Sequence, residues 1–184
     1  MRRLTSFQFI SVDGYYADQQ GDTSWHPHDD EGAAYAAEML ASSHTLVFGR
    51  VTYEFMASFW PTPMAAEVMP AVAKGMNQAD KIVFSRTLKK ADWRGATVVS
   101  DDAVDAMKRL KQTSGKDLTL LGSGSLLRQF AEHRLIDELQ LMVDPLILGR
   151  GRSVFEGVSH RLDLKRVKTR NFDNGCVLIV YRPA

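Results

Sequence analysis

A glycine, an arginine and a hydroxyl side chain stand together where an expected strand meets an expected helix. The apolar stretch 45–49 ends in Gly49, and Arg50 and Thr52 follow at the first turn of the next segment. Free backbone N–H groups and the helix dipole favour an anion at a helix N-terminus, so this turn is a candidate phosphate-binding site. Alternatively, Gly49 only makes the turn, Thr52 caps the helix and Arg50 is solvated.

A second turn also places a hydroxyl and an arginine at the end of an expected strand. The strand expected near 81–85 ends in Ser85 and Arg86, and open α/β sheets bind their ligands at the carboxyl ends of the strands. A solvated loop arginine is the simpler alternative for Arg86.

A third turn follows the strand expected near 117–121. It consists of Gly122, Ser123, Gly124 and Ser125 and leads into a helix, a composition that lets a pyrophosphate approach the backbone. It is not the dinucleotide-binding fingerprint, because Leu127 stands where that motif needs its last glycine. Three such turns on one sheet are harder to explain by chance than any one of them.

Three acids, Asp29, Asp30 and Glu31, begin the next helical segment after Trp25. Acids at this position commonly complement the helix dipole, and the alternative is that one of them faces a substrate pocket and holds a protonated nitrogen heterocycle. A metal site built from His26, His28 and Asp29 is disfavoured, since their spacing matches no recognised ligand pattern. We therefore predict no metal.

The elements that must position these residues alternate along the chain, which is typical of an α/β domain with a largely parallel sheet. Asn174 and Gly175 form the strongest short-range hairpin signal, so we expect the sheet to end antiparallel. No repeat or linker divides residues 1–184, and we predict a single domain. The expected strands lie near 4–12, 45–49, 81–85, 96–100, 117–121, 138–144, 162–171 and 176–182, and the expected helices near 30–42, 52–57, 65–78, 101–113 and 124–134.

The composition is that of an ordinary globular protein. The 184 residues include 23 basic and 22 acidic side chains, for a net charge of +1, and this balance argues against nucleic acid as a partner. A lone cysteine, Cys176, excludes an internal disulfide and fits a reducing cytoplasm. Since the chain has neither a signal-peptide core nor a long apolar run, we expect a cytoplasmic protein without a membrane partner.

The order of the motifs resembles the dihydrofolate reductase superfamily, in particular stand-alone proteins similar to the reductase domain of bacterial riboflavin biosynthesis. Each matching segment is weak by itself, whereas the ordered set spans nearly the whole chain. The segments are Ser-Val-Asp-Gly at 11–14, Leu-Val-Phe-Gly-Arg-Val-Thr-Tyr-Glu at 46–54, Lys-Ile-Val-Phe-Ser-Arg-Thr-Leu at 81–88, Leu-Leu-Gly-Ser-Gly at 120–124, Leu-Ile-Asp-Glu-Leu at 135–139 and Pro-Leu-Ile-Leu-Gly-Arg-Gly at 145–151.

This resemblance implies an eight-stranded, mostly parallel sheet that ends in an antiparallel hairpin, with helices on both faces. It also implies NADPH across the carboxyl ends of the strands and hydride transfer to a C=N or C=O bond of a small pteridine-like or pyrimidine-like substrate. Arg50 and Thr52 would meet the cofactor phosphates, Ser85 and Arg86 the 2′-phosphate, and the turn at 122–126 the pyrophosphate and nicotinamide.

For the substrate side, the resemblance points to two carboxylates. Trp25, followed five residues later by Asp30, is similar to the arrangement with which folate reductases hold the pteridine ring, and the register could equally select Asp29 or Glu31. Asp13 is the counterpart suggested by riboflavin-type reductases. The family further suggests a homodimer. The alternative function is a sensor or carrier that binds NADPH or a pterin without turnover.

Overall fold

Apolar and β-branched runs at regular intervals form one eight-stranded sheet in the computed structural model, which describes residues 1–184. The strand order is β5-β4-β3-β6-β1-β7-β10-β9, and the first six strands in this order run parallel. This confirms the predicted dihydrofolate reductase-like α/β fold. The bounds are β1 (Leu4–Ser11), β3 (Thr45–Gly49), β4 (Lys81–Phe84), β5 (Ala96–Val99), β6 (Leu118–Leu121), β7 (Glu138–Asp144), β9 (Leu164–Asn171) and β10 (Val177–Pro183).

The antiparallel end of the sheet is the hairpin that Asn174 and Gly175 predicted. Strand β10 pairs antiparallel with both β7 and β9. The turn is closed by the N–H of Phe172, which donates to the carbonyl of Cys176 at 3.0 Å. Gly175 adopts φ +89° there, a conformation that side chains other than glycine rarely tolerate.

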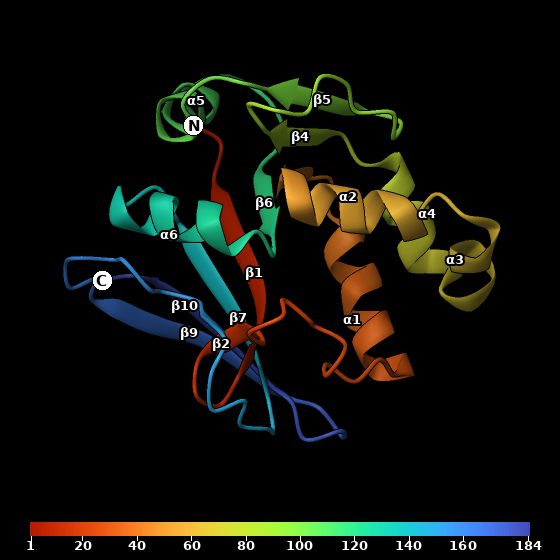
Figure 1. Ribbon diagram of the computed structural model, residues 1–184, viewed down its shortest axis with the longest axis vertical. Helices are drawn as coiled ribbons and strands as arrows, with labels where there is room; N and C mark the ends of the chain where they lie inside the picture. Colours follow the sequence, from red (N-terminus) through yellow and green to blue (C-terminus); the bar gives the residue numbers. More distant parts are fainter.

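Helices cover both faces of the sheet (Figure 1). The core on one face includes residues from α5 and α6, and the core on the other includes residues from α1, α2 and α4. No helix is both long and apolar enough to cross a membrane. The bounds are α1 (Asp30–Ala41), α2 (Arg50–Phe59), α3 (Pro63–Val68), α4 (Pro70–Gln78), α5 (Ala103–Gln112) and α6 (Gly124–Glu132).

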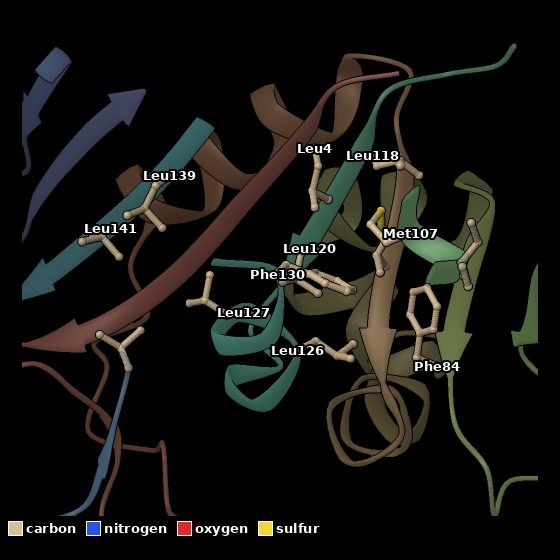
Figure 2. Close-up of a cluster of buried hydrophobic side chains, with 14 of the residues drawn as sticks. Leu4, Phe84, Met107, Leu118, Leu120, Leu126, Leu127, Phe130, Leu139 and Leu141 are labelled. Carbon is tan, nitrogen blue, oxygen red and sulfur yellow. The ribbon is translucent and has the colours of Figure 1, made fainter. Parts of the chain in front are cut away.

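Alternation along β1 separates the two cores, because successive side chains of a strand point to opposite faces. Leu4 and Ile10 pack on the α5 and α6 side, whereas Phe7 packs on the α1 side. Figure 2 shows Leu126, Leu127 and Phe130 of α6 directed toward the strands of the first core. These contacts hold α6 against the sheet, and the glycine-rich turn at 122–125 leads into this helix.

Two features differ from the sequence-based expectation. The helix expected at 65–78 is two helices, because Pro70 has no N–H with which to continue α3 and begins α4 instead. Strands β2 (Tyr15–Ala17) and β8 (Arg152–Ser153) form a separate two-stranded ribbon. At three and two residues, these strands are too short to produce a detectable sequence period.

Lys81 is a buried cation at the start of β4, only 1% exposed. Its Nζ donates to the carbonyls of Ala79 at 2.7 Å and Arg94 at 3.1 Å, and it lies 4.3 Å from the ring centroid of Trp93. Burial lowers the pKa of Lys81 to about 8. The charged form is therefore disfavoured in the folded protein relative to the unfolded chain.

We expect the free energy of unfolding to depend on pH through this lysine. Between a pH of about 8 and the ordinary lysine pKa of 10.5, Lys81 is protonated in the unfolded chain but not in the folded protein. The contribution of Lys81 to the free energy of unfolding therefore rises with pH by about 2–3 kcal/mol over this range. Urea unfolding of the wild type and Lys81→Met at pH 7 and pH 10.5 measures this difference. Parallel pH dependence in the two proteins would contradict it.

Candidate functional site

A cleft of about 1360 Å³ runs over the carboxyl ends of the central strands and along the sheet beneath α1. Its walls include the turn before α2, the turn before α6, the loop at 21–29 and the first turns of α1. Of the predicted cofactor-binding residues, those on two turns line it: Gly49, Arg50, Thr52, Gly122, Ser123, Gly124 and Ser125. The fold therefore brings two of the three predicted anion-binding turns to one cavity.

The turn before α6 has an unusual backbone. Gly122 and Ser123 both adopt left-handed conformations, with φ of +55° and +58°. A Cβ atom on Gly124 would lie only 2.4 Å from Cε1 of Tyr16, so the tyrosine ring packs directly on this turn. A side chain at position 124 would therefore displace Tyr16, and the left-handed backbone at position 122 favours glycine.

Ser123 joins this turn to the one before α2. Its Oγ accepts a hydrogen bond from the Gly49 N–H at 2.9 Å and donates to the Leu121 carbonyl at 3.1 Å. A Cβ on Gly122 would be 3.4 Å from Cγ2 of Thr52, so the two turns are also in van der Waals contact. The Gly49 N–H is consequently used within the protein and is not available to a ligand.

The helix N-termini at the two turns differ from others in the fold. α1, α3 and α5 are capped by Asp29, Thr62 and Asp102, whereas α2 and α6, like α4, have no side-chain cap. The N–H groups of Gly124 and Ser125 make no hydrogen bond within the protein, and Thr52 does not cap α2. The unsatisfied N–H groups at the start of α6, beside the uncapped start of α2, fit the phosphates of a dinucleotide.

Arg50 and the turn that contains Ser85 and Arg86 are less enclosed than the two turns that line the cleft. Arg50 lines the cleft and pairs with Glu54 at 2.8 Å on the same helix. Ser85 and Arg86 lie outside the cleft lining. The Ser85 hydroxyl accepts from the N–H groups of two residues that follow it in the chain, and Arg86 is 77% exposed and 3.7 Å from Asp102. Because β4 adjoins β3 in the sheet, this turn lies beside the cleft-lining turn before α2.

Asp13, the first predicted catalytic carboxylate, does not line the cleft. It accepts hydrogen bonds from the Ser11 hydroxyl at 2.6 Å and from the N–H groups of Leu148 and Gly149 at 3.2 and 2.8 Å. These bonds, the one from Ser11 above all, lower the pKa of Asp13 below its ordinary value. In this structure Asp13 connects the loop after β1 to the loop after β7.

Asp30, the second predicted catalytic carboxylate, is exposed and lies outside the cleft lining. The acid at this helix start that lines the cleft is Asp29. One of its oxygens caps α1 through the Gly32 N–H at 2.7 Å, and the other accepts from the Asn174 amide at 2.6 Å. Asp29 thus has a structural role that the three adjacent acids could not distinguish in the sequence.

A cluster that the sequence analysis missed lies at the carboxyl end of β7. Asp144 is fully buried, and its Oδ1 is 2.7 Å from Nδ1 of His26 and accepts the Cys176 thiol at 3.2 Å. Burial, followed by these contacts with Asp144, raises the pKa of Cys176 to about 12, so it is a neutral thiol. An acid ending an apolar strand just before Pro145 was the available signal.

The first comparison concerns sequence. Residues 2–178 match the family model described as the RibD C-terminal domain. The uncharacterized protein YyaP of Bacillus subtilis is 30% identical over 180 residues, which are 98% of this chain and 94% of that protein.

The second comparison concerns solved structures. A putative riboflavin biosynthesis protein from Shewanella sp. PV-4 superposes with a TM-score of 0.75 at 23% identity, covering 99% of each chain. A diaminohydroxyphosphoribosylaminopyrimidine deaminase/5-amino-6-(5-phosphoribosylamino)uracil reductase from Thermotoga maritima superposes with a TM-score of 0.69 at 19% identity. All of this chain is covered, but only 57% of the Thermotoga chain. At these identities the likeness concerns the fold.

Proposed function

The chain belongs to the family of RibD C-terminal domains, and on that basis we propose that it is an NADPH-dependent reductase. The acceptor is a C=N or C=O bond of a small pteridine-like or pyrimidine-like molecule. NADPH, when bound, supplies the hydride, and the protein supplies position and electrostatics.

The pair of uncapped helix N-termini that open onto one cleft carries this proposal. The turn before α6 presents the unsatisfied N–H groups of Gly124 and Ser125 to the cavity, and the Ser123 hydroxyl ties this turn to the uncapped start of α2. Such a cradle suits the two phosphates of a pyrophosphate better than a single anion. Arg50 is close enough to contribute charge, and Thr52 packs against the turn opposite.

The other part of the cleft fits a flat acceptor. Phe9, Tyr35, Met142 and Phe172 line it, and Gln140 adds an amide. The Gln140 Oε1 accepts from the Tyr35 hydroxyl at 3.1 Å, which fixes the orientation of the amide. Apolar walls with few polar groups are typical of sites for heterocyclic ligands.

Absorbance of the reduced nicotinamide tests whether the protein turns over. The wild type is incubated with NADPH and single compounds from a panel of dihydropteridines, pyrimidine ribitols, ribosylaminouracils and quinones. Steady loss of absorbance that depends on one compound supports a reductase. Binding of NADPH without loss in any mixture would favour the alternative, a sensor or carrier.

The preference for NADPH over NADH is expected to depend on Arg86. A charge-assisted hydrogen bond to the 2′-phosphate contributes about 1.5–3 kcal/mol, so Arg86→Ala should weaken NADPH binding roughly tenfold to a hundredfold and leave NADH binding nearly unchanged. Titration of both cofactors against both proteins measures this. Lys89→Ala, which removes an exposed positive charge from the same loop, is the matched control. Equal affinity of the wild type for the two cofactors would contradict the assignment.

Cytoplasmic location, the homodimer and the single domain remain predictions from the sequence.

A further inference from the structure

His26 is held against the floor of the cleft by contacts on two sides. Its ring centroid lies 3.6 Å from that of Phe9, so the two rings pack closely at an interplanar angle of 31°. Its Nδ1 lies 2.7 Å from the Asp144 carboxylate. Only 10% of the His26 side chain is exposed. These contacts give the imidazole one defined orientation.

The second ring nitrogen is free. His26 lines the cleft, and its Nε2 makes no hydrogen bond within the protein. A carboxylate bonded to Nδ1 favours the tautomer that keeps a proton there, so a second proton is taken up and released at Nε2. The free nitrogen is therefore a potential proton donor to a ligand in the cleft.

Asp144 suits the role of an orienting group. It is fully buried, its Oδ2 has no hydrogen-bond partner, and no lysine or arginine pairs with it. A buried carboxylate requires hydrogen-bond partners, and the His26 ring and the Cys176 thiol supply them at Oδ1. Since Ser11 and Asp144 are partners in the pairing of β1 with β7, the sheet itself fixes the position of the carboxylate.

The acids at the start of α1 are less suited to donate a proton. Asp30 does not reach the cleft, and both oxygens of Asp29 already accept hydrogen bonds from Gly32 and Asn174. Both Asp29 oxygens are therefore already engaged within the protein. Among these three side chains, only His26 presents an unoccupied donor position.

We propose that His26 donates the proton in the proposed reduction and that Asp144 is its positioning residue. This inference rests on the proposed function. The acceptor carbon gains the hydride with its electron pair, and the acceptor nitrogen or oxygen takes the proton from Nε2 of His26. The C=N or C=O bond is reduced, NADPH is oxidised to NADP⁺, and solvent restores the proton to the imidazole.

The charged and titratable groups that face His26 allow this role. Asp144 and the neutral thiol of Cys176 lie on one side, and the His28 ring lies edge-on with its centroid 5.2 Å away. Burial, and then the proximity of His26, lowers the pKa of His28, while Asp144 and Asp29 act in the opposite direction. His28 therefore stays neutral more readily than an ordinary histidine, and the two rings need not both be charged.

The kinetic test uses two named probes, 7,8-dihydrobiopterin for a C=N acceptor and phenanthrenequinone for a C=O acceptor. General acid catalysis contributes on the order of a hundredfold to ten-thousandfold, so His26→Asn should lose kcat by that factor with the Kd for NADPH unchanged. Asp144→Asn should lose less, and His133→Asn, at an exposed histidine outside the cleft lining, is the matched control with nearly normal kcat. The dependence of kcat on pH should differ between the wild type and His26→Asn, because only the wild-type ring transfers a proton.

A second measurement needs no cofactor and no turnover. In ¹H–¹⁵N spectra of the ligand-free protein, neutral His26 should carry its proton on Nδ1, and Asp144→Asn should abolish that preference. Melting temperatures identify any variant that fails to fold. If a variant does not fold, the position of the proton on neutral His26 in the wild type still tests whether His26 and Asp144 are hydrogen-bonded.

The possible outcomes separate the two proposals. If the wild type reduces a probe and His26→Asn does so equally well, the proton donor is not His26 while the proposed function stands. A proton on Nε2 in the neutral wild-type ring, or activity that EDTA removes and Zn²⁺ restores, would also overturn the assignment. If the wild type binds NADPH but reduces neither probe, the reductase proposal fails and this inference fails with it.

Discussion

Gly124→Val is expected to weaken NADPH binding by at least about a hundredfold, equivalent to roughly 2.7 kcal/mol, with only a modest fall in melting temperature. The reason is steric. A Cβ at this position would lie 2.4 Å from Cε1 and 2.5 Å from Cζ of Tyr16. The new side chain and the tyrosine ring cannot both keep their places, and either displacement alters the backbone surface on which the pyrophosphate is proposed to lie.

The melting temperature should change little because Gly124 is not in a left-handed conformation, so valine is compatible with its backbone. Tyr16 belongs to the short β2–β8 ribbon rather than to the main sheet. Fluorescence titration with NADPH and thermal unfolding measure the two effects separately. Gln129→Val places the same β-branched residue on an exposed position of α6 and should leave binding intact. Normal binding by Gly124→Val, or loss of its secondary structure, would assign the glycine a different role.

Phe130→Ala is expected to lower the free energy of unfolding by about 3–5 kcal/mol. Phe130 is fully buried in the core between α6 and the sheet, and its ring meets that of Phe84 edge-on with centroids 5.9 Å apart. Figure 2 shows the ring between the helix and the strands. Truncation removes this contact and leaves a cavity beneath the helix that begins at the cleft.

For a domain of this length, such a loss corresponds to a fall in melting temperature of roughly 6–20 °C. Urea unfolding gives the free energy and calorimetry gives the melting temperature. Gln129→Ala, at the preceding and exposed position of the same helix, controls for a change of helix propensity. If Phe130→Ala lowered the free energy of unfolding by less than about 1 kcal/mol, neighbouring side chains would have repacked into the cavity and the prediction would be wrong.

The strands and the two glycine-containing turns that line the cleft were predictable because their signals are local. Buried parallel strands appear as short apolar runs, and the turns before α2 and α6 combine glycine with hydroxyl residues directly after such runs. The Asn174-Gly175 hairpin depends on backbone conformations that few residues adopt. The order of motifs along the chain identified the family, and the family model confirms it.

The division of the carboxylates between cleft and surface was not predictable, because it depends on contacts distant in sequence. Asp13, Asp29 and Asp30 have the same side chain and all lie near expected element boundaries. Asp13 is held by Leu148 and Gly149 of the loop after β7, and Asp29 by Asn174 of the terminal hairpin. The partners of Asp13 and of Asp29 cannot be inferred from the spacing of residues in the sequence.

The pairing of His26 with Asp144 joins residues 118 positions apart. The sequence by itself determined which segments form strands, which strand-to-helix turns carry glycine and hydroxyl residues and to which family the chain belongs, since these follow from residue type, local periodicity and the order of motifs. Only the tertiary structure decided which side chains meet at the cleft. That outcome depends on the parallel pairing of β1 with β7 and on the packing of the loop at 21–29 over Phe9, long-range contacts that no local pattern encodes.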